Sequence, residues 1–196
     1  MENISLEHKM ENIWYEIYDP NTDAIVKKTM KDFEGKWLVL CFYPADFTFV
    51  CPTELKDLNK AYDDIQKANA EILVVSTDTV FSHKRRIETE KLLENFKIQM
   101  VSDRTAELSK LFGVLNSASG NAARGTFIIS PDGVVKSIEI VTEPLGRSSN
   151  ELVRKLQALE FIRSNPGQAC PANWNAGSPT LKPSISIAGK VREELK

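Results

Sequence analysis

Apolar runs rich in β-branched and aromatic residues alternate along this chain with segments whose apolar residues recur every three or four positions. The clearest run is KWLVLCFY, residues 36–43. A helical pattern follows from Pro52 to about residue 68, with Leu55 and Leu58 on one face. Alternating strand and helix patterns are typical of an α/β protein, in which helices cover a central sheet.

The same alternation continues to a last helix that stops at Pro166 and Gly167. The following segment is rich in proline and glycine, so we expect a domain over 1–165 and an extended C-terminal arm over 166–196 that carries Cys170. Between the first helix and the arm, the pattern predicts a strand at 71–78, a helix at 81–96, a short strand at 98–103, a short helix at 105–113, a hairpin at 125–141 and a helix at 149–165.

The charge balance argues against several partner classes. The chain of 196 residues has 25 Lys and Arg against 27 Asp and Glu, a net charge of −2. Such a balance produces no strong field for nucleic acid or an anionic membrane, so we expect neither as a partner. The N-terminus has no apolar signal region, and no run approaches the roughly 18 apolar residues of a spanning helix. We therefore expect a cytoplasmic protein.

Three cysteines, Cys41, Cys51 and Cys170, are too few and odd in number for a secreted disulfide scaffold. Reduced or reversibly oxidised thiols fit better. His8 and His83 are the only histidines, and no pair of ligands has the spacing of a zinc site. We expect no metal cofactor.

Cys51 follows a predicted strand and precedes Pro52, so it lies at a helix N-terminus. A thiol reacts as the thiolate, and an ordinary thiol is only a few per cent ionised at neutral pH. A helix start favours an anion by about 0.3–2 kcal/mol, so a nearby cation is also needed. Thr48 can offer a hydroxyl, and Arg124 is a permanent charge that a folded sheet can bring close.

Position alone leaves the role of each thiol open. Cys51 fits a small core side chain as well as a nucleophile, and Cys41, inside an apolar run, fits inert strand packing. Cys170 lies in an arm that cannot bury much, which fits a redox thiol equally well. Glu54 stands where C-x-x-C chemistry needs a second cysteine, so that exchange is excluded. A lone activated cysteine with a distant second one suits oxidation by peroxide followed by disulfide formation.

Two motifs carry a family resemblance. PADFTFVC, residues 44–51, matches the P-x-x-x-[ST]-x-x-C signature of peroxiredoxins, and GQACPANW, 167–174, resembles the segment around the resolving cysteine of the typical two-cysteine class. VSTDT at 75–79 and TLKPSISIAGK at 180–190 extend the resemblance over nearly the whole chain. The chain is most similar to the peroxidase subunits of bacterial alkyl hydroperoxide reductases. This implies a thioredoxin-like fold with a central mixed β-sheet.

The resemblance implies a thiol-dependent peroxidase that reduces hydrogen peroxide and small alkyl hydroperoxides in antioxidant defence, without haem, flavin or metal. It implies that Cys51 becomes a sulfenic acid, which Cys170 of a partner subunit resolves as an intersubunit disulfide. By the same resemblance, Pro44 shields the pocket and Thr48 hydrogen-bonds the thiolate and the peroxide. Arg124 then stabilises the thiolate and the transition state.

Glu54 and Arg147 match positions that orient the arginine network in the family. Family members form antiparallel homodimers, often five of them in a decameric ring. Phe47 and Phe81 fall where dimers usually meet, although ordinary core packing is an equally open interpretation. The expected reductant is a flavoprotein alkyl hydroperoxide reductase subunit or a thioredoxin system, and the sequence does not say which.

The sequence departs from relatives at two positions. Val80 stands in place of a histidine, and Arg86 in place of a tryptophan, which puts apolar packing beside the active site in doubt. His83 is retained, and we interpret it as a solvated helix histidine because the cycle needs no imidazole.

Two other functional classes remain open at this stage. One is a ring-forming holdase or redox sensor, in which the peroxide reaction is a signal, and slow turnover with a recycling reductase distinguishes it from a peroxidase. The other is a thioredoxin-like domain with inert thiols, which forms no disulfide-linked dimer after one equivalent of peroxide.

Overall fold

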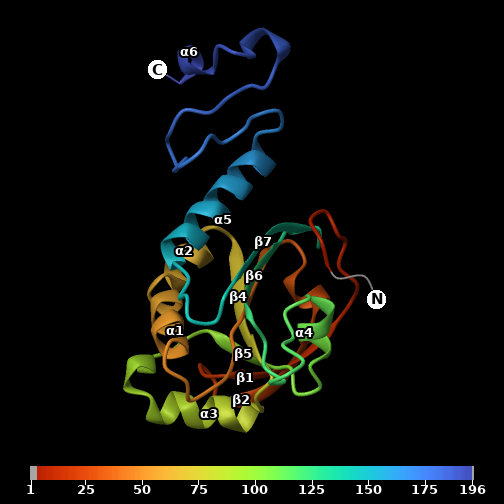
Figure 1. Ribbon diagram of the computed structural model, residues 1–196, viewed down its shortest axis with the longest axis vertical. Helices are drawn as coiled ribbons and strands as arrows, with labels where there is room; N and C mark the ends of the chain where they lie inside the picture. The colour runs from red at the N-terminus through yellow and green to blue at the C-terminus, as the bar shows by residue number, and fades with distance from the viewer. Residues whose placement is uncertain (1–3, 196) are drawn as a thin grey trace. The chain divides into compact units, whose positions relative to one another are not determined.

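The computed structural model describes residues 4–195. The chain divides into two compact units between Ser149 and Asn150, and each is described by itself. In the described residues, the first unit contains a seven-stranded sheet of order β2-β1-β5-β4-β3-β6-β7 (Figure 1). The strands are β1 (Trp14–Asp19), β2 (Ala24–Thr29), β3 (Trp37–Phe42), β4 (Ala70–Ser76), β5 (Gln99–Ser102), β6 (Arg124–Ile129) and β7 (Val135–Val141).

The sheet is mixed, as predicted. β3, β4 and β5 run parallel to one another, whereas β1, β6 and β7 pair antiparallel with their neighbours. The elements around the sheet are α1 (Cys51–Lys60), α2 (Tyr62–Lys67), α3 (Val80–Thr89), α4 (Glu107–Leu111), η1 (Met30–Phe33) and η2 (Lys91–Leu93). All six residues of β3 are buried, which explains why this strand reads as an unbroken apolar run.

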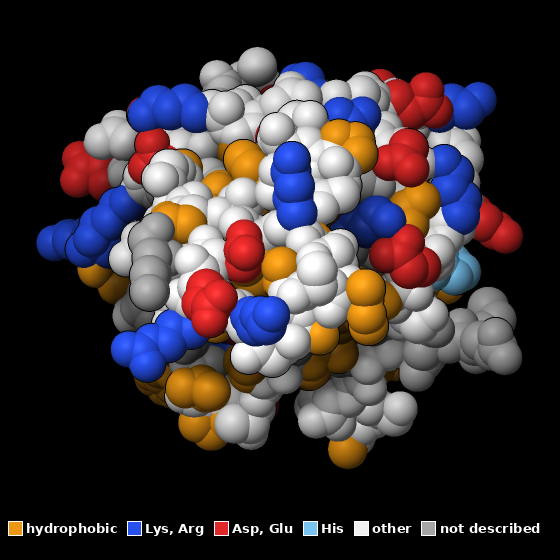
Figure 2. All heavy atoms as spheres, turned by 90° about the horizontal axis from the view of Figure 1, so that it is seen from above, with side chains coloured by type: hydrophobic (Ala, Val, Ile, Leu, Met, Phe, Trp, Pro, Cys, Tyr) orange, Lys and Arg blue, Asp and Glu red, His pale blue; other side chains and the backbone are white. Residues whose placement is uncertain are grey.

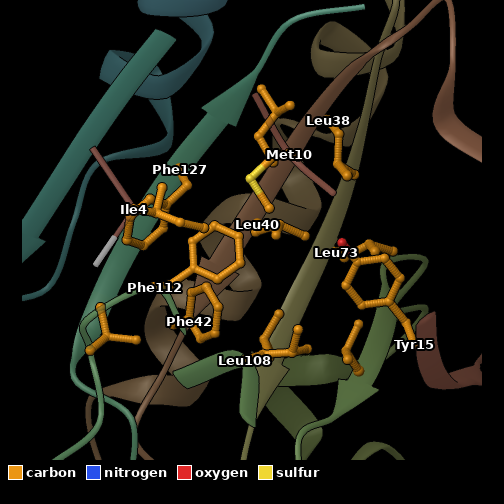
Figure 3. Close-up of a cluster of buried hydrophobic side chains, with 14 of the residues drawn as sticks. Ile4, Met10, Tyr15, Leu38, Leu40, Phe42, Leu73, Leu108, Phe112 and Phe127 are labelled. Atoms are coloured by element: carbon orange, nitrogen blue, oxygen red, sulfur yellow. The ribbon is translucent and has the colours of Figure 1, made fainter. Parts of the chain in front are cut away.

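One face of the sheet packs into an apolar core with α4 and the N-terminal segment (Figure 3). Alternate residues of β3, including Leu40 and Phe42, point into this core because side chains of a strand alternate between its faces. Phe42, Phe112 and Phe127 form an aromatic trio, with ring centroids 4.7–5.7 Å apart. The trio fixes the end of β3, from which the chain continues towards Cys51.

Several predicted elements have different bounds. The helix predicted from Pro52 to about residue 68 is two helices, because the chain bends at Ala61 between α1 and α2. The helix predicted at 81–96 ends at Thr89 and is followed by the short turn η2. The hairpin of β1 and β2 was not predicted at all. The other hairpin turns at Gly133 as expected, with a φ of 75° that suits glycine.

The second unit contains α5 (Ser149–Ser164) except for its first residue, together with η3 (Ile185–Ile187) and α6 (Val191–Glu194), joined by extended segments. Its segment after α5 buries more than the sequence led us to expect. Trp174 is 3% exposed, its ring centroid lies 5.1 Å from that of Phe161, and its carbonyl accepts a hydrogen bond from Arg154 at 3.2 Å. An isolated bridge pairs Ala169 with Leu181.

The surface carries charges of both signs. Figure 2 shows Lys and Arg side chains interspersed with Asp and Glu side chains on the face that it presents. Among the described residues, no helix is long and apolar enough to cross a membrane.

Candidate active site

The register of the sheet brings Arg124 to Cys51. β3 ends at Phe42, and the active-site loop, residues 43–50, leads from it to Cys51 at the start of α1. β6 pairs antiparallel with β3, and Phe42 lies opposite Gly125. Arg124, one residue earlier in β6, therefore lies beside the point where β3 passes into the loop. Its Nη1 is 3.4 Å from the Cys51 Sγ, and both residues are buried.

Glu54 joins the two arginines of the site. It lies three residues after Cys51, so the two side chains share one face of α1. The buried Glu54 carboxylate accepts hydrogen bonds from Arg124 Nη1 and, at 2.9 Å, from Arg147 Nε. Arg147 also donates its backbone N–H to Glu54 at 2.8 Å, and Arg124 Nε donates to the carbonyl of Glu143 at 2.6 Å. These bonds fix the guanidinium of Arg124 against the sulfur.

The charges at this cluster do not cancel. Glu54 contributes one negative charge, and Arg124 and Arg147 contribute two positive charges, so the buried group carries one net positive charge. A buried cation favours the ionised form of an acid in contact with it. A thiolate at Cys51 would balance the cluster, and the arrangement therefore favours a nucleophilic sulfur.

The active-site loop is held by its own backbone. The Thr48 hydroxyl donates to the carbonyl of Ala45 at 3.0 Å, and Pro44 is buried. Phe47 has a φ of 55°, a conformation that is unfavourable for a bulky residue and that recurs at functional loops. The sequence pointed to Thr48 and Pro44, but the carbonyls of Ala45 and Glu143 carry no sequence signal.

The profile of the AhpC/TSA family matches residues 16–138, more than half of the chain. The chain belongs to the AhpC/TSA family. The matched region contains Cys51, Glu54 and Arg124, whereas Arg147, the other arginine bound to Glu54, lies beyond it.

Individual members of the family agree with this assignment. Alkyl hydroperoxide reductase C of Ferdinandcohnia aciditolerans is 47% identical over 166 residues, which cover 85% of this chain and 99% of that relative. Alkyl hydroperoxide reductase C of Staphylococcus aureus is 43% identical over 174 residues, covering 89% of this chain and 92% of the relative.

Solved structures of related proteins also resemble this chain closely. AhpC of Enterococcus faecalis matches with a TM-score of 0.81 and 38% identity, over 87% of this chain and all of that one, 100%. The reduced 2-Cys peroxiredoxin of Plasmodium vivax matches with a TM-score of 0.89 and 30% identity, over 95% of this chain and 98% of that one. The predicted resemblance to peroxiredoxins and the thioredoxin-like fold are confirmed, and the chain is an enzyme of this class.

Three phenylalanines of this AhpC/TSA protein are exposed. Phe47 and Phe49 lie in the active-site loop, and Phe81 lies in the first turn of α3. Phe47 is 60% exposed, Phe49 94% and Phe81 70%. The interpretation of Phe47 and Phe81 as core aromatics is therefore wrong for the single chain. Phe49 was not singled out from the sequence, although it belongs to the same signature motif.

His83 is not a solvated histidine, contrary to the sequence interpretation. It is fully buried, its Nδ1 lies 2.9 Å from an Asp46 carboxylate oxygen, and its Nε2 lies 3.1 Å from the carbonyl of Val101. Burial has the largest single effect on the pKa of the Asp46 carboxyl and raises it. The hydrogen bonds to Asp46, of which the one with His83 has the largest effect, and the nearby charge together outweigh burial, so the pKa lies below its ordinary value. The histidine thus ties the active-site loop to β5.

Arg86 is also buried, so a charged side chain takes the place of the apolar packing that was in doubt at this position. A charged guanidinium, 1% exposed, occupies the place beside Tyr43 and Asp46. The sequence identified the departure but not the partner.

The two remaining cysteines differ from Cys51. Among the described residues all three thiols are free. Cys170, in the second unit, is half-buried, and its Sγ lies 3.8 Å from the carbonyl of Ala158. Burial raises the pKa of the Cys170 thiol, against an opposing effect of Arg154. A thiol with a raised pKa is the poorer first nucleophile.

Cys41 is expected to resist alkylation in the native protein. It is 3% exposed within β3, and burial raises the pKa of its thiol. Treatment of the native protein with iodoacetamide, followed by mass spectrometry of the peptides, should find Cys170 modified and Cys41 unmodified. Alkylation of Cys41 at the rate seen in the unfolded protein would contradict its interpretation as inert packing.

Proposed function

We propose that this chain is a thiol-dependent peroxidase that reduces hydrogen peroxide and small alkyl hydroperoxides in antioxidant defence. The observation that carries the proposal is the contact of Arg124 Nη1 with the Cys51 Sγ, at 3.4 Å, in a fully buried site. A thiol in contact with a permanent cation is prepared to react as an anion. The thiolate is the nucleophile that attack on an O–O bond requires.

In the first step, the Cys51 thiolate attacks the terminal oxygen of the hydroperoxide. An S–O bond forms as the O–O bond breaks, so Cys51 is oxidised to a sulfenic acid and the peroxide is reduced. The leaving alkoxide or hydroxide takes up a proton and becomes an alcohol or water. Arg124 stabilises the charge that develops on the oxygens, Thr48 hydrogen-bonds the peroxide, and Pro44 shields the sulfur.

Resolution uses Cys170 of a partner subunit. Its thiol attacks the sulfenic sulfur of Cys51, water leaves, and an intersubunit disulfide forms. The raised pKa of Cys170 suits this order, because Cys51 then meets the peroxide first. Two electrons from a dithiol reductant return both cysteines to thiols.

The cycle implies a reductant and a second copy of the chain. The reductant is a flavoprotein alkyl hydroperoxide reductase subunit or a thioredoxin system. Homodimers that assemble as a pentamer of dimers would cover the exposed rings of Phe47 and Phe81. Such an interface would account for these apolar side chains on the surface of the single chain. A cytoplasmic location stays a prediction from the sequence.

Replacement of Cys170 tests both the peroxidase and its resolution step. We expect the purified protein to consume hydrogen peroxide over many turnovers with dithiothreitol or a thioredoxin system. Cys170→Ser should keep only the activity with dithiothreitol, because a small thiol can reach the sulfenic acid without the arm. Non-reducing electrophoresis after one equivalent of peroxide should show a linked dimer in the wild type alone. A wild-type protein that consumes no peroxide would rule out the proposed function.

A further inference from the structure

A second buried charge lies against the active-site loop. Arg86, in the last turn of α3, donates from Nη1 to an Asp46 carboxylate oxygen at 3.3 Å. Asp46 also accepts from the hydroxyls of Tyr43 and Ser82, each at 2.8 Å, and lies beside His83. The Asp46 carboxylate therefore already has three other hydrogen-bonding neighbours, and Arg86 is not needed to satisfy it.

The bonds of Arg86 are directed at the loop. Its Nη1 also donates to the carbonyl of Ala45 at 3.1 Å, whereas its Nε and Nη2 meet no acceptor within residues 4–195. Burying unpaired N–H groups costs free energy, and an apolar side chain can fill such a place without that cost. Arg86 therefore fits a requirement of the loop better than a requirement of stability.

The carbonyl of Ala45 links Arg86 to Thr48. It accepts from Arg86 at 3.1 Å and from the Thr48 hydroxyl at 3.0 Å, so both of its lone pairs are engaged. Because the hydroxyl proton of Thr48 is committed to this carbonyl, the Thr48 oxygen is left with lone pairs that can only accept. A hydroperoxide carries an O–H donor, which is the group that such an oxygen binds.

We propose that Arg86 is a positioning residue for the hydroperoxide. It fixes the Ala45 carbonyl, which holds the Thr48 hydroxyl proton and so presents the Thr48 oxygen as an acceptor to the O–H of the substrate. This inference rests on the proposed peroxidase function and deepens it. Arg86 itself does not touch the reacting atoms.

The first test replaces Arg86 by methionine, which keeps an unbranched side chain and removes every N–H donor. Arg85→Met is the matched control, because Arg85 is the neighbouring residue on α3, is exposed, and pairs with Glu88 at 3.3 Å. The rate constant of Cys51 oxidation by hydrogen peroxide is measured in a single turnover. We expect Arg86→Met to lower it about 10- to 100-fold, the effect of a displaced binding group, and Arg85→Met to leave it unchanged.

The second test asks whether Arg86 acts through Thr48. Thr48→Val removes the hydroxyl, and we expect the loss caused by Arg86→Met to disappear in that background, because the link is already broken. A general weakening of the structure would lower the rate by the same factor in both backgrounds.

Alkylation of Cys51 by iodoacetamide separates positioning from opening of the site. This reagent needs the sulfur but not the hydroperoxide site, and Arg124 is untouched in the variant. We expect Arg86→Met to alkylate at the wild-type rate. A raised rate would indicate local opening, and a lowered rate would indicate loss of the thiolate, and either would overturn the inference.

Arg86→Lys keeps the experiment decisive if circular dichroism shows that Arg86→Met is unfolded. A single ammonium group cannot make both contacts in the geometry of the guanidinium, so the lysine variant should lose rate in the wild-type background and not with Thr48→Val. A folded Arg86 variant that is oxidised at the wild-type rate, or an equal loss in both backgrounds, overturns the inference. An inactive wild-type protein would instead overturn the peroxidase proposal.

Discussion

Cys51→Ser is expected to reduce peroxide consumption to the rate of the buffer with reductant alone. The substitution keeps the size of the side chain and its place at the start of α1, but a serine hydroxyl is not ionised by one neighbouring guanidinium. Sulfenic acid can then not form, and no linked dimer should appear after peroxide treatment. Peroxide loss in the presence of dithiothreitol measures the first effect, and non-reducing electrophoresis measures the second.

Cys41→Ser is the matched control for that experiment. It removes another buried thiol of the same unit, on β3 rather than at a helix start, and it should retain peroxide consumption if the variant folds. Circular dichroism establishes folding for both variants. Peroxide consumption that persists in Cys51→Ser but is lost in Cys41→Ser would show that Cys41 is the reacting thiol, and it would overturn the assignment of the site to Cys51.

Three of the strands that the sequence predicted, β3, β4 and β6, are buried along almost their whole length. They read as apolar runs because helices or other chain segments cover them. β7, at the other edge of the sheet, is mostly half-buried, and the turn at Gly133 is what indicated its hairpin with β6. The hairpin of β1 and β2 escaped prediction because β2, at the edge of the sheet, has only three apolar residues, followed by Lys27 and Lys28. Its pairing depends on neighbours that a local pattern does not contain.

The features of the site also fall into two groups, those that local sequence predicts and those that depend on contacts between distant residues. The position of Cys51 at a helix start follows from local sequence, since Pro52 marks the first turn. The contact with Arg124 depends on the register of β3 with β6, which pairs residues far apart in the chain. The chemistry of Cys51 called for a nearby cation and made Arg124 a candidate, and the resemblance to peroxiredoxins pointed to the same residue, but the local sequence could not supply the contact.

His83 shows a misjudgement that the sequence could have prevented. It lies three residues after Val80 and four before Ile87, so helical geometry places it on the apolar face of α3 rather than in solvent. Its partner, Asp46, lies on the active-site loop, and this contact could not be predicted because nothing local joins the two segments. The same holds for Arg86 and the carbonyl of Ala45.

Arg124→Met is expected to slow oxidation of Cys51 about 30- to 5,000-fold. It removes both the N–H that contacts the sulfur and the positive charge, so Glu54 and Arg147 are left as a neutral pair and a thiolate would be an uncompensated buried anion. Removing one partner of a buried charged hydrogen bond costs about 2–5 kcal/mol, and each 1.36 kcal/mol is a factor of ten in rate. Stopped-flow measurement of a single turnover with hydrogen peroxide gives the rate.

The Arg124 variant should also differ in kind from the Arg86 variant. Because Arg124 contacts the sulfur itself, its loss should slow alkylation of Cys51 by iodoacetamide as well as oxidation by peroxide, whereas loss of Arg86 should slow oxidation alone. Arg104→Met, at an exposed position of the same unit, controls for the general loss of a positive charge. If Arg124→Met were oxidised within a few-fold of the wild-type rate while Cys51→Ser was inactive, the helix start alone would have to stabilise the thiolate, and the buried cluster would have another role.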